Sequence, residues 1–479
     1  MQKLFSELFR VGRGFYWGGS RLGGVCRNWS LSLLGGVLSI SSAAVLFSGC
    51  ASLAVRPDFE ATVQRANSQV FPAVVYIHAV AADLESGKEQ GNVIRGSGVI
   101  ISPSGEVLTN FHVADKASNI RCLLNNSDAY EAEIIGYDKD VDLALLQLKL
   151  PPDAAPLPYA ELEAEPVREG QFVMAMGAPW GMNRSVSIGI ISCSSRYLPG
   201  ESEYSLWYQT DAAISPGNSG GPLVNTHGRI VGINTLGMNY GGDMGFAIPA
   251  GTIADVVPRL REYKAANWAW TGLELQPLHD FDLDINFDFA NGVIVSGTAE
   301  GSPARLAGVL PKDRIVAMNN VPITVMNAEA MPDFRRKLGL LPFDVPVKLT
   351  IMRGDEELSI DVTPQAKGVV EGENLILKRW GITVKAINRF DNPDLFHYRN
   401  SGVYVYGIDY SGNAGRSRLR TEDIITHING KEINDLAAMQ TAYDEAVANV
   451  ANRSKAVFGV LRNGAARQLV IEFSRENEK

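Results

Sequence analysis

The C-terminal half of the chain repeats itself with a period near 110 residues, and self-similarity at a fixed period indicates copies of one folded module. Gly-Val-Ile-Val at 292–295 recurs as Gly-Val-Tyr-Val at 402–405, and Asp-Arg-Ile at 313–315 recurs as Asp-Ile-Ile at 423–425. A chain of 479 residues is also too long for a single core. We therefore predict two similar modules, at residues 268–366 and 377–475, behind an N-terminal domain.

The segment from residue 58 to residue 262 consists of short apolar runs that are broken by Gly and Pro. Typical examples are Ala-Val-Val-Tyr-Ile at 73–77, Ala-Leu-Leu-Gln-Leu at 144–148 and Ile-Val-Gly-Ile at 230–233. Short strands at close spacing favour an all-β barrel arrangement over alternating strands and helices.

The most chemically informative stretch is Ser-Pro-Gly-Asn-Ser-Gly-Gly-Pro-Leu at 215–223. Glycine beside Ser219 permits backbone angles that other residues avoid and lets a substrate carbonyl approach the main chain. Backbone amides that converge on a developing oxyanion are worth about 3 kcal/mol of barrier. The stretch predicts a nucleophilic serine in an oxyanion-binding turn, although such a composition is also common in ordinary loops.

A serine nucleophile needs a histidine base and a carboxylate that orients it. Among the six histidines, His112 lies where an apolar run ends in a polar turn. Asp142 follows a charged turn and opens the apolar run at 143–146, with Asp140 as its rival. The order His112, Asp142, Ser219 predicts a catalytic triad.

These motifs resemble those of the HtrA/Do (Deg) family of chymotrypsin-fold serine proteases. The family's Thr-Asn-x-His-Val motif is matched at 109–113, its Asp-Leu-Ala-x-Leu motif at 142–146, which favours Asp142 over Asp140, and its Gly-Asn-Ser-Gly-Gly-Pro-Leu motif at 217–223. The resemblance implies an all-β, chymotrypsin-like double β-barrel at 58–262, with an oxyanion hole at Gly217, Asn218 and Ser219. It also implies a substrate pocket at Ala213, Asn234 and Thr235, where the absence of a carboxylate predicts cleavage after small or medium aliphatic residues.

The two repeated modules resemble PDZ domains, which are α+β folds that bind peptide C-termini. Ser-Pro-Ala at 302–304 is typical of the first copy, and the corresponding stretch of the second, at 412–417, matches more loosely. A structural spacer is the alternative for both copies. The resemblance places carboxylate-binding loops at Trp270, Thr271, Gly272 and Leu273 and at Arg379, Trp380, Gly381 and Ile382.

The N-terminus predicts a lipoprotein signal. Five basic residues precede an uncharged stretch from Trp29 to Phe47, and Leu-Phe-Ser-Gly-Cys at 46–50 resembles a bacterial lipobox. We expect a signal peptide at 1–49, acylation of Cys50 and a tether at 50–57. Ala51 and Ser52 then indicate an outer-membrane lipoprotein facing the periplasm. An uncleaved anchor and plain secretion are the alternatives.

Composition excludes other function classes. The chain has 44 basic and 53 acidic residues, so nothing indicates nucleic-acid binding. No cysteine spacing indicates a metal, and no cofactor is expected. Cys122 and Cys193 are expected to be buried free thiols rather than a disulfide.

Together these features predict an ATP-independent, lipid-anchored envelope endopeptidase that degrades unfolded or misfolded polypeptides. A chaperone or peptide-binding scaffold and a peptide-activated regulatory protease are the alternatives. The resemblance further implies a homotrimer or larger homo-oligomer, for which Phe59, Val70 and Phe71 are candidate contacts; barrel capping is their other interpretation.

Overall fold

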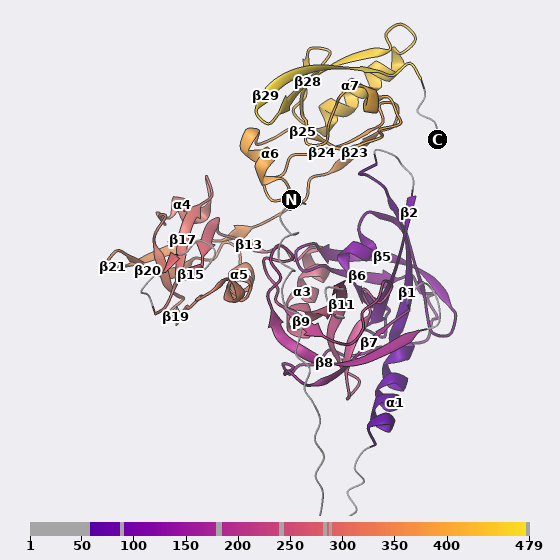
Figure 1. Ribbon diagram of the computed structural model, residues 1–479, viewed down its shortest axis with the longest axis vertical. Coiled ribbons are helices and arrows are strands. Elements are labelled where there is room, and N and C mark those ends of the chain that lie inside the picture. Colours follow the sequence, from indigo (N-terminus) through magenta and orange to yellow (C-terminus); the bar gives the residue numbers. More distant parts are fainter. Residues whose placement is uncertain are drawn as a thin grey trace, which may run out of the picture. The chain divides into compact units, whose positions relative to one another are not determined.

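The computed structural model describes residues 58–86, 91–178, 184–238, 244–280, 285–286 and 290–475. Its N-terminal domain contains two closed barrels, each of six antiparallel strands, which confirms the predicted double barrel (Figure 1). The strand order is β1-β2-β3-β6-β5-β4 in the first barrel and β10-β11-β12-β9-β8-β7 in the second. The first barrel comprises β1 (Val74–Ala82), β2 (Gly91–Ile100), β3 (Glu106–Thr109), β4 (Ala117–Leu123), β5 (Ala129–Asp138) and β6 (Leu143–Leu148). The second comprises β7 (Phe172–Gly177), β8 (Ser185–Arg196), β9 (Trp207–Thr210), β10 (Pro222–Asn225), β11 (Ile230–Met238) and β12 (Met244–Pro249).

Helices of this domain flank the barrels at three places. The first helix begins where the Asp58 carboxylate accepts a hydrogen bond from the Glu60 amide (3.2 Å), as a helix cap does. Val70, one of the three candidate oligomer contacts, is fully buried at the end of this helix. The helical segments are α1 (Phe59–Val70), η1 (Phe71–Ala73), α2 (Phe111–Ala114) and α3 (Ala250–Tyr263). Within the described residues no helix is long and apolar enough to span a membrane.

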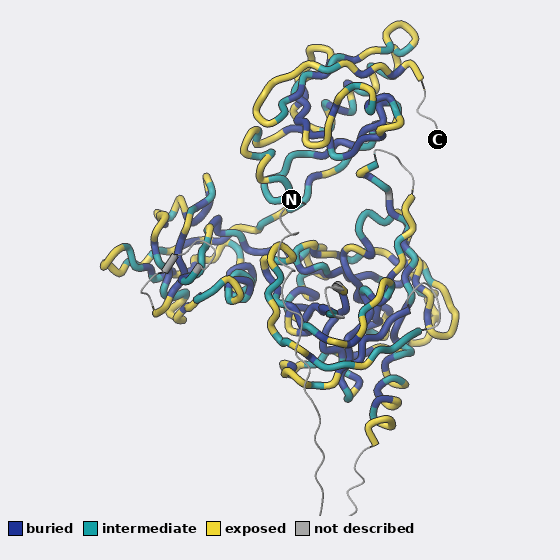
Figure 2. The backbone as a smooth tube through the Cα atoms, in the orientation of Figure 1, coloured by how far each residue is buried: buried dark blue, intermediate teal, exposed yellow. Residues whose placement is uncertain are grey.

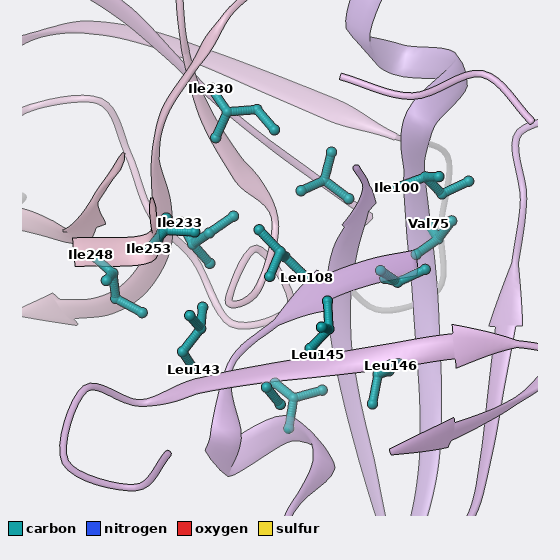
Figure 3. Packing of buried hydrophobic residues seen from close by; sticks show 14 of the residues in the cluster. Val75, Ile100, Leu108, Leu143, Leu145, Leu146, Ile230, Ile233, Ile248 and Ile253 are labelled. Atoms are coloured by element: carbon teal, nitrogen blue, oxygen red, sulfur yellow. The ribbon is translucent and has the colours of Figure 1, made fainter. Parts of the chain in front are cut away.

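One apolar core continues from the first barrel into the second and under α3 (Figure 2). In the first barrel, β6 buries four consecutive apolar residues, 143–146, on both of its faces. Figure 3 shows Leu143 of β6 close to Ile248 of the second barrel, in the same cluster as Ile253 of α3. Because side chains from both barrels pack in a single cluster, the loops at their junction are held in a fixed relation.

The first repeated module is built on an antiparallel sheet in the order β14-β17-β18-β20-β21, with β19 paired to β18. Its α4 begins at the Ser302 cap with Pro303 in the first turn, a position where proline is well tolerated. Two small strand pairs, β13–β22 and β15–β16, accompany it. Its strands are β14 (Leu273–Gln276), β17 (Val293–Thr298), β18 (Arg314–Met318), β19 (Val321–Pro322), β20 (Val347–Arg353) and β21 (Glu356–Val362), with β13 (Ala269–Trp270), β22 (Gln365–Ala366), β15 (His279–Asp280) and β16 (Ile285–Asn286). Its helices are α4 (Pro303–Leu306), η3 (Ala328–Ala330) and α5 (Met331–Gly339).

The second module has the same plan with one strand more at its edge, in the order β23-β24-β25-β26-β28-β29, with β27 paired to β26. The predicted boundary at residue 377 falls on the last residue of that additional strand. Its strands are β23 (Asn374–Leu377), β24 (Ile382–Ala386), β25 (Val403–Ile408), β26 (Ile424–Ile428), β27 (Lys431–Glu432), β28 (Lys455–Arg462) and β29 (Ala465–Glu472). Its helices are α6 (Pro393–Tyr398), η4 (Ala414–Arg416) and α7 (Leu436–Ala448).

The two copies of the sequence repeat have matching strand pairs and a matching ion pair. Val293 pairs with Ile315 in the first module, and Val403 pairs with Ile425 in the second. A buried aspartate and an arginine form a two-pronged ion pair in each copy. These pairs are Asp313 with Arg353 (2.8 Å) and Asp423 with Arg462 (2.5 and 2.6 Å).

Candidate active site

The three predicted triad residues come together at the junction of the two barrels. His112 lies on α2, directly after β3, and Asp142 lies in the turn between β5 and β6. Ser219 lies in the loop that precedes β10 of the second barrel. The site thus combines two loops of one barrel with one loop of the other.

Asp142 holds His112 in place through several hydrogen bonds. Its carboxylate accepts hydrogen bonds from His112 Nδ1 (2.9 and 3.0 Å) and from the His112 amide (3.0 Å). Its carbonyl accepts from the Phe111 amide (3.1 Å) and from Asn110 Nδ2 (3.1 Å), while its own backbone has a positive φ of 54°. These contacts fix the imidazole so that Nε2 points away from the carboxylate. Asp140, the rival candidate, instead forms an ion pair with Lys367, with Oδ2 3.5 Å from Nζ.

Thr235 on β11 connects Asp142 to the second barrel. Its hydroxyl donates a hydrogen bond to Asp142 Oδ2. Its carbonyl accepts the hydroxyl proton of Ser219, at 3.2 Å. The resemblance implied that Thr235 belongs to the substrate pocket. In the structure its hydroxyl binds the Asp142 carboxylate and its carbonyl binds the Ser219 hydroxyl.

Two backbone amides of the Ser219 loop have no hydrogen-bond acceptor among the described residues. The Asn218 amide donates to the Ser215 carbonyl (2.9 Å), and Gly217 has a φ of 101° that favours glycine. Among the described residues, no carbonyl accepts from the amides of Gly217 and Ser219. Of the three residues predicted for the oxyanion hole, these two therefore keep donors for a substrate oxygen, and Asn218 shapes the turn.

Ser97 on β2, which was not predicted from the sequence, forms hydrogen bonds to the Ser219 loop. Its hydroxyl donates to the Gly217 carbonyl (2.6 Å) and accepts from the Ala178 amide (2.8 Å), and the residue is fully buried. Its own amide donates to the Ser219 carbonyl (2.8 Å). The peptide unit between Gly217 and Asn218 is consequently held at both ends. The only sequence signal was a hydroxyl residue between two glycines, Gly96 and Gly98.

The predicted pocket residues Ala213 and Asn234 have different environments. Asn234 is buried, and its Nδ2 donates to the carbonyls of Met176 (3.3 Å) and Pro222 (3.2 Å), so it supports the interior of the second barrel. Ala213 is exposed, and its carbonyl accepts from Ser187 Oγ (2.6 Å).

Ile214, the residue after Ala213, packs over two glycines that face each other on the paired strands β11 and β12. A Cβ built on Gly245 would lie 2.7 Å from Ile214 Cδ1, and one built on Gly237 would lie 2.6 Å from the Ile214 carbonyl oxygen. Glycines at both positions therefore leave room for this isoleucine. Ile214 therefore places an apolar side chain beside Ala213, one of the residues predicted for the substrate pocket.

A buried carboxylate lies at the base of the turn that carries Asp142. Asp138 accepts hydrogen bonds from the Val141 amide (3.0 Å) and from Trp268 Nε1 (3.0 Å). Burial, together with the neighbouring Asp140 charge, raises the pKa of Asp138 to about 7. Trp268 itself is buried and stacks on Tyr204, with ring centroids 4.3 Å apart.

The cysteines form no further reactive or metal-binding site among the described residues. Cys122 and Cys193 are free, Cys122 buried and Cys193 partly buried, and burial raises the pKa of the Cys122 thiol to about 12. In the part of the chain that the structure describes, no cluster of three or more His, Cys, Asp or Glu side chains could hold a metal ion. Cys50 and the predicted signal lie outside the described residues.

Comparison with known proteins agrees with this geometry. The chain matches the trypsin-like peptidase domain at residues 96–233 and the PDZ domain at residues 264–352 and 380–473. It is 35% identical to a probable periplasmic serine endoprotease DegP-like of Marinomonas sp. (strain MWYL1), over 71% of this chain and 72% of that protein. It is 33% identical to the protein of the same description from Pseudomonas putida (strain W619), over 78% of this chain and 77% of that protein.

Solved structures give the same result. The HtrA-type protease AlgW with tripeptide is similar with a TM-score of 0.56 and 28% identity, over 65% of this chain and 98% of that one. The serine endoprotease from Yersinia pestis is similar with a TM-score of 0.51 and 28% identity, over 63% of this chain and 97% of that one. The chain is thus a serine endopeptidase and belongs to the family of DegP-like, HtrA-type serine endoproteases.

Proposed function

We propose that this endopeptidase degrades unfolded or misfolded polypeptides in the bacterial envelope without ATP. The observation that supports this best is that the His112–Asp142–Thr235 network meets a serine loop in which the amides of Gly217 and Ser219 have no acceptor among the described residues. No nucleotide is required, because hydrolysis of an exposed peptide bond is downhill and an unfolded substrate presents such bonds directly.

In the proposed mechanism the Ser219 hydroxyl turns from the Thr235 carbonyl toward His112 Nε2. Ser219 Oγ attacks the scissile carbonyl carbon while its proton passes to Nε2, and the amides of Gly217 and Ser219 stabilise the oxyanion. His112 then gives the proton to the leaving amine. A water molecule, deprotonated by the same nitrogen, then attacks the acyl carbon, and His112 returns this proton to Ser219 Oγ as the acyl–oxygen bond breaks. Asp142 holds the imidazole and stabilises its charged form throughout.

We propose that the first PDZ domain captures the C-termini of substrate chains. In the described sheet β14 pairs with β17 alone, so its other edge is open to an added peptide strand. The adjacent loop contains the predicted Trp270, Thr271, Gly272 and Leu273. Tethering a captured chain to the protease raises its local concentration at the cleft.

We propose a membrane-attached location on the periplasmic side, through acylation of Cys50. The curated relatives are described as periplasmic, and the lipobox-like residues 46–50 supply an acceptor thiol. Three acyl chains, at about 0.8 kcal/mol per buried CH₂, hold a protein on a bilayer essentially irreversibly. Labelling with a palmitate analogue tests this. Wild-type protein that takes up no label, while a known lipoprotein in the same cells does, refutes the anchor.

We also propose a homotrimer formed through the region of α1. Phe59 and Phe172 are both about half-exposed and form an aromatic pair with ring centroids 4.9 Å apart. Exposed aromatic pairs are typical of interface centres. Light scattering of the chain from residue 52 onward tests the assembly, and a monomer at micromolar concentration contradicts it.

The deciding experiment is digestion of casein by the full chain, with Ser219→Ala as the control. We expect cleavage by the wild type and none by the variant. Binding of casein without cleavage supports a chaperone or scaffold instead. Cleavage that requires an added C-terminal peptide supports a peptide-activated regulatory protease.

A further inference from the structure

The two PDZ domains differ at the edge where a peptide would bind. In the first domain, β14 pairs with β17 and, within the described sheet, with no strand on its other side. In the second, β24 pairs with β25 on one side and with β23 on the other, in register from Leu377↔Ile382 to Asn374↔Lys385. The second domain's binding edge is therefore already occupied.

The loops beside these two edges are structurally equivalent. Gly272 and Gly381 precede the edge strands with φ values of 73° and 71°. The same backbone hydrogen bonds recur around them. They are Ala304 N to Thr271 O (3.0 Å) with Ala414 N to Trp380 O (2.9 Å), and Ala299 N to Gly272 O (2.8 Å) with Asp409 N to Gly381 O (2.9 Å).

The amides of the two loops nevertheless have different partners. In the second domain the amides of Trp380 and Gly381 both donate to the carbonyl of Leu377, each at 3.0 Å, and the Gly381 amide also donates to the carbonyl of Lys378 (3.1 Å). In the first domain no described residue accepts from the equivalent amides of Thr271 and Gly272. A peptide's terminal carboxylate binds to such loop amides. The Leu377 carbonyl thus takes the place that a terminal carboxylate would have.

The side chains of β23 are also placed like those of a bound peptide. Leu377 is fully buried, and Leu375 packs against the same apolar cluster, which includes Met439 and Ala442 of α7. Residues two apart on a strand share a face, so both leucines point the same way. β23 contacts both β24 and α7 and runs antiparallel to β24.

We propose that residues 374–377 are an internal ligand of the second PDZ domain, which takes a free peptide only by displacing them. Four residues join Leu377 to Ile382, and so short a connection gives an effective concentration in the millimolar range. When the tethered segment has an intrinsic dissociation constant in the micromolar range, it weakens the apparent affinity of a competing free peptide by about a thousandfold. The displacing ligand is an extended peptide with a free carboxylate and aliphatic side chains at its last and third-last positions. This inference rests on the proposed capture of C-termini.

The test uses the full chain with Ser219→Ala, which prevents self-digestion, and a fluorescent peptide Glu-Asn-Leu-Ile-Leu that copies residues 373–377. Gly272→Ala closes the first domain, because the new Cβ would lie 2.1 Å from Ser302 Cβ. In this background we expect negligible binding at micromolar protein. Adding Leu375→Ala and Leu377→Ala should strengthen binding by about a hundredfold, toward the intrinsic affinity. Equal binding with and without these two substitutions overturns the proposal. The same peptide with an amidated C-terminus is the control and should not bind.

Hydrogen exchange of the full chain with Ser219→Ala alone decides the case even if the double substitution unfolds the domain. We expect uniform protection across residues 382–386, which have a strand on both sides. Within residues 273–276 the amides that face the open edge should exchange rapidly and gain protection when the peptide is added. Rapid exchange in 382–386 that the peptide suppresses refutes the internal ligand. If residues 273–276 gain no protection from the peptide, the capture function of the first domain fails independently.

Discussion

Removing the Ser97 hydroxyl should impair catalysis without touching the triad. In Ser97→Ala the Gly217 carbonyl and the Ala178 amide lose bonds of 2.6 and 2.8 Å at a fully buried site. Each buried polar group left without a partner costs about 1–3 kcal/mol. The turn can reduce this cost by rotating the Gly217–Asn218 peptide unit, which then rests on the Asn218–Ser215 bond alone.

The expected size follows from the position of this peptide unit between the two oxyanion donors. Complete loss of one donor costs about 10²–10³ in kcat. Because Ser97 only positions the donors, we expect a fall of about 10–100-fold in kcat, equivalent to roughly 1.4–2.7 kcal/mol, with KM changed by less than about threefold. Ser97→Gly should recover part of the loss, since the vacated space admits a bridging water.

The assay combines peptide cleavage with binding of a peptide boronate, whose adduct places an oxygen at the oxyanion position. Thr210→Val is a matched control. The buried Thr210 hydroxyl also bridges a carbonyl, that of Ile190 (2.7 Å), and an amide, that of Ala212 (3.1 Å), but not in the Ser219 loop. Both variants should lose comparable thermal stability, and only Ser97→Ala should lose boronate affinity relative to substrate affinity. A kcat for Ser97→Ala within about twofold of the control's would falsify the positioning role.

Three further outcomes are expected. Ser219→Ala or His112→Ala should each abolish nearly all peptidase activity with the fold intact by circular dichroism, because the triad acts as a unit; Asp142→Asn should also be severe, and full activity there would exclude Asp142 as the orienting acid. Cleavage should follow Val, Ala or Ile, and Ile214→Ala should shift it toward Leu, Met and Phe by about 10–100-fold in relative kcat/KM; mass spectrometry of the products checks this, and dominant cleavage after Lys or Arg contradicts the pocket. Because the folded pKa of Asp138 is about 7 and its ordinary value is about 4, the folded state retains a proton that the unfolded chain releases. The stabilisation that the retained proton gives the folded state is complete below pH 4 and is lost as the pH rises to 7. Thermal stability measured from pH 5 to 8 should therefore fall less steeply in Asp138→Asn than in the wild type. An unchanged slope counts against a protonated Asp138.

Much of the site could be read from the sequence because each role is written in a short local pattern. The glycines around Ser219, the turn before Asp142 and the end of the apolar run before His112 mark turns and strand ends through their own residue types. The repeat of residues 292–295 in 402–405 likewise predicted two similar modules, since equal spacing of apolar residues gives equal strands. The choice of Asp142 over Asp140 came from resemblance, and the structure accounts for it through hydrogen bonds to the backbone and ring of His112.

What only the tertiary structure decided is which distant segments share a hydrogen bond. Thr235 and Asp142 are 93 residues apart, and Ser97 and Gly217 are 120 apart, so no local pattern could pair them. The same holds for Asn374–Leu377, whose sequence reads as an ordinary strand wherever it lies. A strand pairs with whichever backbone edge is open beside it, and that edge exists only once the sheet has formed. The sequence thus determined the strands and the reactive residues, and the assembled sheets determined which of their edges and amides remained free for a substrate.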